Sequence, residues 1–387
     1  MATVSSGRIL ADHDDLIVEI LSWLPVTSIG RFRCVSKTWK SLISGSYFVK
    51  LHVERSSRNP QIVLMLRKEH EKQCFMALFF SISSLIENPV PTFRASVGHS
   101  PISSRILFGS CNGLLSIHES LSTDEYEEHW VDFWNPVTKT SSGPSPSLRL
   151  NYDTDFQYLR NFWYNNDFYY FRNFGFGYDD RSDSYKVVIM LLHTRTLRTS
   201  VWVYCMGDQH WNCTLTNCSA FHTIDSNGHS LNGTVNWLGF SEESRKKVQI
   251  FSYDLYNDTC KYLSVPELPY KEPHANSIGI LNGCLCFFLH EKTDFVVLVL
   301  KDIQDETSWT QLLRVSYNRL QINEYSSNLR ILCMSGDLLL LTYSKMGYCE
   351  FIIFNLKDNK VESIEGLFQP IVFNMFSFPY APTFISL

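Results

Sequence analysis

The sequence lacks the features that define several large classes of protein. No run of about eighteen apolar residues occurs among its 387 residues, so we expect no transmembrane helix. The first residues show no basic start followed by an apolar core, so we expect no secretory signal. A GxxxxGK phosphate loop, an HExxH zinc motif and a GxSxG nucleophile elbow are also absent. We therefore expect a protein that is not an enzyme.

Metal-binding patterns are also missing. The eleven cysteines are irregularly spaced without paired CxxC motifs, so we expect no zinc site and mostly reduced, buried thiols. Asp179, Asp180 and Asp183 resemble part of a cation-binding loop, but the remaining ligands are absent and a hairpin tip is favoured. We predict no cofactor and no metal, and a location in the cytoplasm, the nucleus or both.

The charge is small and unevenly distributed. The formal net charge is −5, yet residues 1–60 hold eight basic and five acidic residues and therefore carry +3. The rest of the chain holds 26 basic and 34 acidic residues, which gives −8. A mildly acidic main body argues against nucleic acid as a partner. We expect neither nucleic acid nor a membrane to be bound.

The stretch from residue 14 to 44 has the spacing of three short helices. Apolar residues recur at helical intervals in its first part, where Asp14 or Asp15 can cap the first turn. Pro25 disfavours helical geometry at Leu24, so the first helix should end there. Thr27 or Ser28 can cap a second helix, and Ser36 can cap a third. The first helix has more apolar residues than so small a unit can bury, which leaves an interface for a partner.

This stretch resembles the F-box. The segments DLIVEILSWLPV, RFRCV (31–35) and SKTWKSLI carry the likeness, which covers about residues 12–51. F-boxes usually have Leu-Pro just before the first Asp-Leu, whereas Asp12 and His13 stand there in this chain. The resemblance implies that the module binds an SKP-family adaptor and, through it, a cullin-RING ubiquitin ligase. The residues expected to contact the adaptor, or to support those that do, are Leu16, Ile17, Ile20, Leu21, Leu24, Pro25, Val26, Ile29, Phe32, Val35, Trp39 and Leu42.

A repeated pattern of strands follows residue 60. Four segments place a tight turn before an apolar strand: SCNGLLSI (110–117), SLNGTVNWLGF (230–240), ILNGCLCFF (280–288) and CMSGDLLLLTY (333–343). A second strand follows each of them and ends at a polar residue, namely Asn135, Asp254, Asp302 or Asn355. The segment 175–190, followed by the strand at 200–211, marks a further unit.

Units of about fifty residues with four strands cannot bury both faces alone, but they can when they stack radially. We therefore predict an all-β, kelch-like β-propeller, with six blades favoured and five to seven open. The alternative is an irregular β-sandwich whose Asn-Gly turns are coincidental. The apolar run 371–387 is expected to pair near residues 62–66 and to close the ring.

The second part of the chain also resembles a known family. The motifs GSCNGLL (109–115), WNPVT (134–138), GFGYD (175–179), DSYKVV (183–188) and LNGTVNWL (231–238) are similar to the plant F-box-associated, kelch-like domain. S-locus F-box proteins share this layout. The predicted class is an α+β multidomain protein with a three-helix F-box and a β-propeller. The boundaries are a flexible N-terminus at 1–11, the F-box at 12–54, a linker at 55–60 and the propeller at 61–387.

The second candidate site is aromatic. Residues 152–174 hold eleven aromatic side chains in 23 residues, and Tyr and Trp are favoured binding anchors. We assign substrate binding to Tyr158, Trp163, Tyr164 and Tyr169, with packing between blades as the alternative. The resemblance thus implies a non-catalytic receptor that presents a protein substrate to the SKP-cullin-F-box ligase. Alternatives are an S-locus receptor for secreted ribonucleases, a propeller scaffold without ubiquitination, and a kelch-type copper oxidase.

Overall fold

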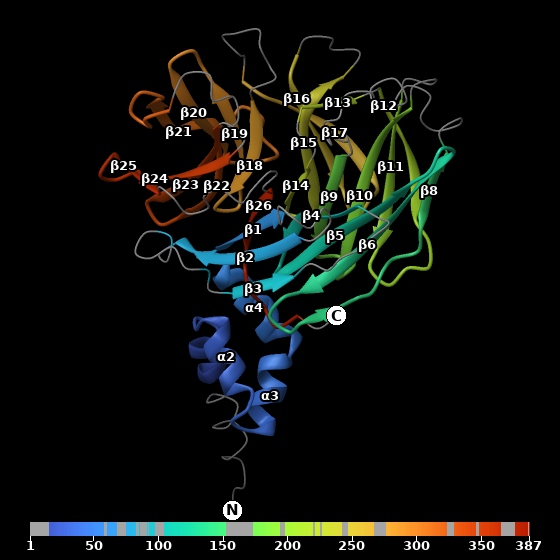
Figure 1. Cartoon of the computed structure of the whole chain (residues 1–387), viewed down its shortest axis with the longest axis vertical. Coiled ribbons are helices and arrows are strands. Elements are labelled where there is room, and N and C mark those ends of the chain that lie inside the picture. The colour runs from blue at the N-terminus through green and yellow to red at the C-terminus, as the bar shows by residue number, and fades with distance from the viewer. Residues whose placement is uncertain are drawn as a thin grey trace, which may run out of the picture.

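The computed structural model describes residues 15–57, 60–67, 75–82, 85, 91, 93–96, 104–151, 173–193, 198–219, 221–224, 227–241, 247–266, 276–322, 329–345, 348–364, 376–385 and 387. These residues form a small group of helices below a ring of six sheets (Figure 1). No helix within these ranges is long and apolar enough to cross a bilayer.

The helical module contains four helices. The chain is helical over residues 15–21, and then forms α2 (Val26–Phe32), α3 (Lys37–Ser44) and α4 (Ser46–Ser56). The Ser36 side chain accepts a hydrogen bond from the Trp39 backbone N–H at 3.1 Å, which confirms the predicted cap of α3. The predicted caps of α2 were wrong, because Pro25 occupies the N-cap position and supplies no side-chain bond.

The core of this module is small. Its fully buried members are Leu21, Ile29, Ile43 and Phe48, which come from the first helix, α2, α3 and α4 respectively. On α4, the His52 Nε2–H donates a 3.1 Å hydrogen bond to the Leu24 carbonyl oxygen. The module is therefore held together by one buried apolar residue from each helix and by this hydrogen bond.

Each of the six sheets is one blade of a propeller. Blade 1 consists of β26 (Phe376–Tyr380), β1 (Gln61–Arg67), β2 (Phe75–Ser81) and β3 (Phe93–Ser96). Blade 2 consists of β4 (Ser104–Cys111), β5 (Leu114–Ser122), β6 (Tyr126–Asn135), β7 (Thr140–Ser141) and β8 (Leu148–Asn151). Blade 3 consists of β9 (Asn173–Asp179), β10 (Ser184–His193), β11 (Arg198–Cys205) and β12 (Asn212–Ser219). The third blade contains the predicted unit at 175–190 and 200–211.

The other three blades follow the same antiparallel plan. Blade 4 consists of β13 (Phe221–Thr223), β14 (His229–Leu231), β15 (Thr234–Ser241), β16 (Gln249–Asp254) and β17 (Thr259–Ser264). Blade 5 consists of β18 (Ser277–Leu281), β19 (Cys284–His290), β20 (Asp294–Leu300) and β21 (Trp309–Ser316). Blade 6 consists of β22 (Arg330–Ser335), β23 (Leu338–Lys345), β24 (Tyr348–Asn355) and β25 (Lys360–Ile364).

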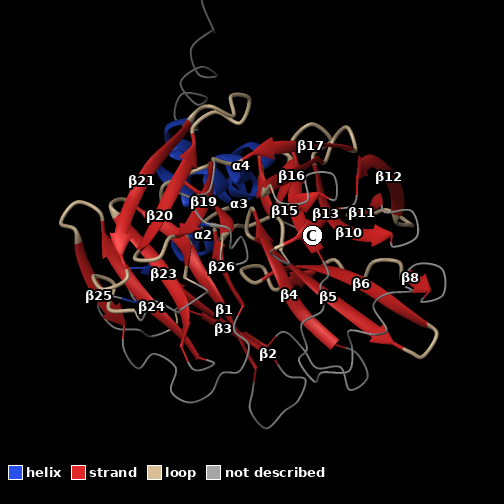
Figure 2. Ribbon diagram, turned by 90° about the horizontal axis from the view of Figure 1, so that it is seen from above, coloured by secondary structure: helices blue, strands red, loops and turns tan. Residues whose placement is uncertain are grey.

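The inner strands of neighbouring blades contact one another around a closed circle. The order of contacts is β26, β4, β9, β14, β18, β22 and back to β26. Figure 2 shows the resulting ring from above. The β-propeller prediction is confirmed, with the favoured number of six blades, and the sandwich alternative is wrong.

The repeated turns adopt the geometry that the sequence predicted. The residue before each glycine and the glycine itself have positive φ in three of them, for example 49° at Asn112 and 82° at Gly113. The polar residues at the ends of the second strands also cap turns. The Asn135 carboxamide oxygen accepts from Val137 N–H at 2.9 Å, and the Asp254 carboxylate accepts from Tyr256 N–H at the same distance.

The last strand closes the ring as predicted. β26 pairs antiparallel with β1, so that Gln61 lies opposite Tyr380 and Met65 lies opposite Phe376. The first blade is therefore built from both ends of the propeller, which removes two free sheet edges. Tyr380 is 2% exposed and its ring lies 5.1 Å from that of Phe79, so the closing strand is anchored in the core.

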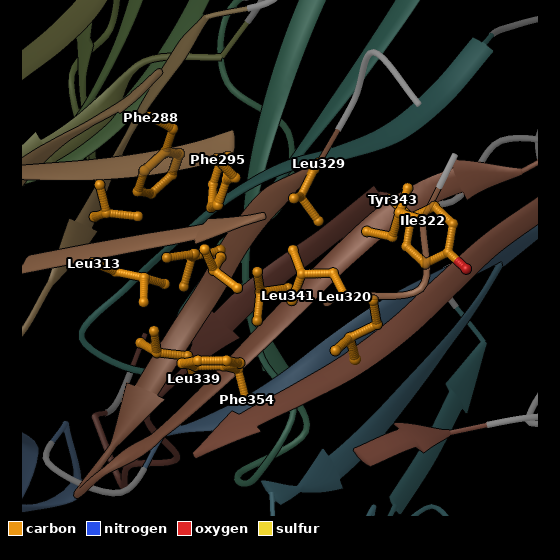
Figure 3. Packing of buried hydrophobic residues seen from close by; sticks show 14 of the residues in the cluster. Phe288, Phe295, Leu313, Leu320, Ile322, Leu329, Leu339, Leu341, Tyr343 and Phe354 are labelled. Atoms are coloured by element: carbon orange, nitrogen blue, oxygen red, sulfur yellow. The ribbon is translucent and has the colours of Figure 1, made fainter. Parts of the chain in front are cut away.

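Neighbouring blades share their apolar cores. Between blades 5 and 6, Phe288, Phe295 and Leu313 pack against Leu339 and other buried residues (Figure 3). Buried aromatic and branched side chains of this kind come from facing surfaces of both sheets, so no blade could bury them alone. This shared packing explains why the ring forms as a unit.

Candidate partner-binding face of the helical module

The first helix exposes a stripe of large apolar side chains. Leu16 and Ile20 of the first helix are 59% and 63% exposed, and Trp23, in the turn that directly follows the helix, is 56% exposed. Their spacing of four and then three residues places them on one side of the helix. An exposed apolar stripe of this kind is typical of a protein–protein interface.

Two more exposed apolar residues lie on the same module. Val35, in the turn before α3, is 64% exposed, and Tyr47, at the start of α4, is 72% exposed. In the described part of the propeller, Tyr256 at 50% and Leu312 at 37% are the only large apolar residues that are exposed, and both are less exposed than those of the module. Exposed apolar surface is thus concentrated on the helical module.

The other residues assigned to adaptor binding lie deeper. Leu21, Val26 and Ile29 are 3%, 8% and 0% exposed, so they face inward in this arrangement. They support the exposed stripe from behind, and any direct contact with an adaptor stays a prediction. Pro25 is exposed. The half-buried residues are Ile17, Leu24, Phe32, Trp39 and Leu42, all of which pack on the small core.

The sequence analysis missed Trp23 and Tyr47. Trp23 lies seven residues after Leu16 and three after Ile20, so the helical spacing alone could have added it to the stripe. Tyr47 lies at the start of α4 and gave no such signal. Its exposure is known only from the structure.

Arg55 of α4 fixes the first helix against the rest of the module. Its guanidinium forms an ion pair with Glu19 at 2.6 Å and also hydrogen bonds to the Ser22 hydroxyl. It lies 4.4 Å from the centre of the Trp23 ring, within range of a cation–π interaction. The hydrogen bond from Arg55 lowers the pKa of Glu19, so Glu19 stays ionised at neutral pH. Arg55 thereby holds Trp23 in its exposed position.

The predicted substrate residues Tyr158, Trp163, Tyr164 and Tyr169 lie outside the described residues. The described residues nearest to them, Asn151 and Asn173, lie on β8 and β9. The far end of β9 leads into the turn that carries Asp183, whose carboxylate lies 3.0 Å from Lys50 of α4. Asn173, at the start of β9, is therefore at the opposite end of the ring from the helices.

A few titratable groups in the described part of the ring are buried. His118, His129 and Glu127 form a chain in blade 2, with 3.0 Å between the two imidazoles and 3.5 Å from His129 to the carboxylate. All three are at most 3% exposed.

Burial raises the pKa of the Cys286 and Cys333 thiols to about 12, so both stay protonated at neutral pH.

The aspartates at 179, 180 and 183, which resemble part of a cation-binding loop, lie at the tip of a hairpin. Asp179 and Asp183 flank the tip of the β9–β10 hairpin, as predicted, and Asp179 forms an ion pair with Lys186 at 3.1 Å. No group of metal-binding side chains occurs within the described ranges. Seven described cysteines are free thiols, including Cys284 and Cys286, whereas Cys260 is in a disulfide.

Two known families match the chain. The F-box domain matches residues 13–51, and the F-box associated beta propeller domain matches residues 62–369. The Arabidopsis thaliana F-box/kelch-repeat protein At3g23880 is 27% identical over 317 residues, which are 78% of this chain and 78% of the relative. F-box protein At1g11270 of the same plant is 28% identical over 288 residues, or 72% and 83% of the two chains.

Other relatives match over less of their length. The Arabidopsis F-box protein At2g16450 is 29% identical over 226 residues, which are 58% of this chain and 51% of the relative. Among solved structures, the beta-propeller domain of the Trilobed protease from Pyrococcus furiosus is 8% identical with a TM-score of 0.39, over 69% of this chain and 72% of that one. The two family matches together cover most of the residues. The chain therefore belongs to the F-box proteins that carry an F-box-associated β-propeller domain.

Proposed function

We propose that this protein is the substrate receptor of an SKP-cullin-F-box ubiquitin ligase. The observation that carries the proposal is the stripe of Leu16, Ile20 and Trp23, which is exposed on an F-box whose own core is very small. F-box proteins are generally non-catalytic, and an F-box indicates an SKP-type adaptor as partner. The adaptor binds this stripe, and the cullin complex follows through the adaptor.

The propeller supplies the second binding surface in this proposal. Its helix-facing end is occupied in part by the F-box, so the opposite end is the one open to a substrate. That end carries Asn151 and Asn173, the described residues on either side of the predicted substrate residues. The receptor performs no covalent step; it raises the local concentration of substrate lysines beside the charged conjugating enzyme. It works in the cytoplasm, the nucleus or both.

The test is reconstitution with an SKP adaptor, a cullin, a RING protein and ubiquitin. We expect the full chain to co-purify with the adaptor and to support ubiquitin chains on itself or on captured proteins. Proximity labelling by the wild type and by an F-box deletion should then reveal proteins that accumulate on the deleted form. Secreted ribonucleases in that set would support the S-locus alternative. Adaptor binding without any chain formation would support the scaffold alternative and contradict our proposal.

A further inference from the structure

The chain continues beyond the closing strand as a short C-terminal segment, residues 381–385 and 387 in the structure. The Asn135 side-chain amide donates to the carbonyl of Thr383 at 3.1 Å and to that of Ile385 at 2.8 Å. Asn135 and Thr383 are both 0% exposed. The residue that caps a turn of blade 2 therefore also fixes the C-terminal segment to the ring.

Apolar contacts strengthen this attachment. Ile385 and Leu387 pack against the buried cluster that blades 2 and 3 share, which includes Leu114 and Phe133. Gly113, in the tight turn of blade 2, has no room for a side chain because Thr383 and the Ala381 carbonyl occupy that space. The segment is thus part of the ring along its length.

Phe384 points the other way, into the F-box. Its ring packs on the module core of Leu21, Ile29, Ile43 and Phe48. The edge of the ring would lie 3.3 Å from a side chain placed on Gly30, so a glycine is what allows α2 to approach this closely. The Arg33 guanidinium lies 4.9 Å from the ring centre, in cation–π range. One side chain from the end of the chain therefore completes the F-box core.

A second described link between the two parts is polar and exposed. Lys50 of α4 lies 3.0 Å from the Asp183 carboxylate, and these two side chains are 59% and 69% exposed. Tyr178 also donates a hydrogen bond to Asp183. Exposed ion pairs contribute little to stability and are screened by salt. The apolar contact at Phe384 is therefore better suited than this ion pair to fix the orientation of the F-box.

We infer that Phe384 is a positioning residue, which fixes the F-box on the propeller and thereby sets the direction in which the ring presents its substrate to the ligase. Its role in presentation rests on the proposed function, whereas its role in orientation does not. A fixed orientation restricts which lysines can reach the conjugating enzyme.

The orientation can be tested by a zero-length carbodiimide cross-link in the full chain bound to its adaptor. The reagent joins the Lys50 amine to the Asp183 carboxylate as an amide only while the two groups are in contact. We compare the wild type with Phe384→Ala and with Leu312→Ala, a control at an exposed position on blade 5. We expect to detect the cross-linked Lys50–Asp183 peptide pair in the wild type and in the control, and we expect it to be lost in Phe384→Ala. Phe384→Leu, which keeps apolar volume, should restore part of it.

A second variant guards against misfolding. Gly30→Leu should displace the Phe384 ring from the F-box side without changing the C-terminal segment, and we expect the same loss of the cross-link. Retention of the cross-link in both Phe384→Ala and Gly30→Leu would overturn the inference. So would its loss in the Leu312→Ala control.

The consequence for presentation is measured separately. In the reconstituted ligase, mass spectrometry identifies which lysines of the receptor itself receive ubiquitin. We expect a restricted set in the wild type and a broader set in Phe384→Ala. An identical set in both proteins would contradict the role in presentation. Absence of ubiquitin on every variant would refute the proposed function, while the cross-link would still decide the orientation.

Discussion

The helical module leaves several of its large apolar side chains exposed, whereas the propeller buries nearly all of those that are described. Four residues form the fully buried core of the module, whereas the cluster between blades 5 and 6 alone contains seventeen. The module leaves Leu16, Ile20 and Trp23 more than half exposed, although it is the shorter of the two parts. The ring exposes few such residues because every blade has two neighbours and the last strand closes the circle.

This contrast separates residues that stabilise the fold from residues that are available for binding. In the ring, an apolar residue such as Trp237 has an intramolecular partner, and its loss should be measured as lost stability. In the module, an apolar residue such as Ile20 has no comparable burial, and its loss should be measured as lost affinity. The following variants test that distinction, in decreasing order of the expected effect.

The largest effect is expected for Trp237→Ala in blade 4. Trp237 is 0% exposed and packs beside Phe251 and against the glycines at 175 and 228, so its removal leaves a large cavity. We expect the free energy of unfolding by denaturant to fall by about 3–5 kcal/mol. Tyr256→Ala, at a half-exposed position in the same blade, is the control. A loss of less than about 1 kcal/mol would show that the ring tolerates such cavities.

The next effect concerns binding. Replacing Leu16 and Ile20 together by Ala should weaken adaptor binding by about 2–4 kcal/mol, or roughly 30- to 900-fold, because both side chains would be buried in the complex. Isothermal titration with purified SKP adaptor measures the change. Thermal unfolding of the free chain should stay the same, since both positions are exposed. Unchanged affinity in this double variant would show that the stripe is not part of the interface with the adaptor.

Acid should destabilise the ring through His290. Burial lowers the pKa of His290 to about 4, and its imidazole bonds to the Tyr317 hydroxyl at 2.7 Å and to the Leu329 carbonyl at 3.1 Å. The unfolded chain takes up a proton near pH 6.5 and the folded chain only near pH 4, so stability falls as the pH drops through this window. Between pH 7 and pH 5 the loss should be about 2 kcal/mol.

His290→Gln removes the titrating group and keeps a polar side chain, so the fall in unfolding free energy between pH 7 and pH 5 should shrink by that amount. His210→Gln, at an exposed position, is the matched control. An equal pH dependence in the wild type and in His290→Gln would contradict the assignment. Burial also lowers the pKa of His52 in the module, so both parts should become less stable in acid.

The smallest effect is expected at the cap of α3. Ser36→Ala removes the hydrogen bond to the Trp39 N–H and should cost about 1 kcal/mol of module stability. Hydrogen exchange of the α3 amides in the full chain measures this change locally. Ser44→Ala, at the exposed end of the same helix, is the control, and equal exchange in both variants would argue against the cap.

The sequence predicted the parts of the fold that depend on local geometry. Positive φ at Asn112-Gly113, the turn cap at Asp254 and the helix cap at Ser36 each follow from a few adjacent residues. The closing strand was also predictable, because an open ring would leave a long apolar run without a partner. The caps of α2 were wrong because two polar residues competed with Pro25, whose fixed φ suits the entry to a helix.

The orientation of side chains in the candidate site was less predictable. Leu21 and Ile20 are adjacent and both apolar, yet one is buried and the other exposed, since the helix turns by about 100° per residue. The contact of Phe384 with the F-box joins the two ends of the chain, and no periodicity in the sequence indicates it. The role of the aromatic segment 152–174 stays a prediction.

The central claim is that the helical module, and not the ring, binds the adaptor. Hydrogen exchange of the full chain with and without purified SKP adaptor tests it most directly. We predict protection confined to the helical module, strongest in the first helix around Leu16, Ile20 and Trp23, with the blade strands unchanged. Absence of any association, or protection located on the blades, would contradict the account.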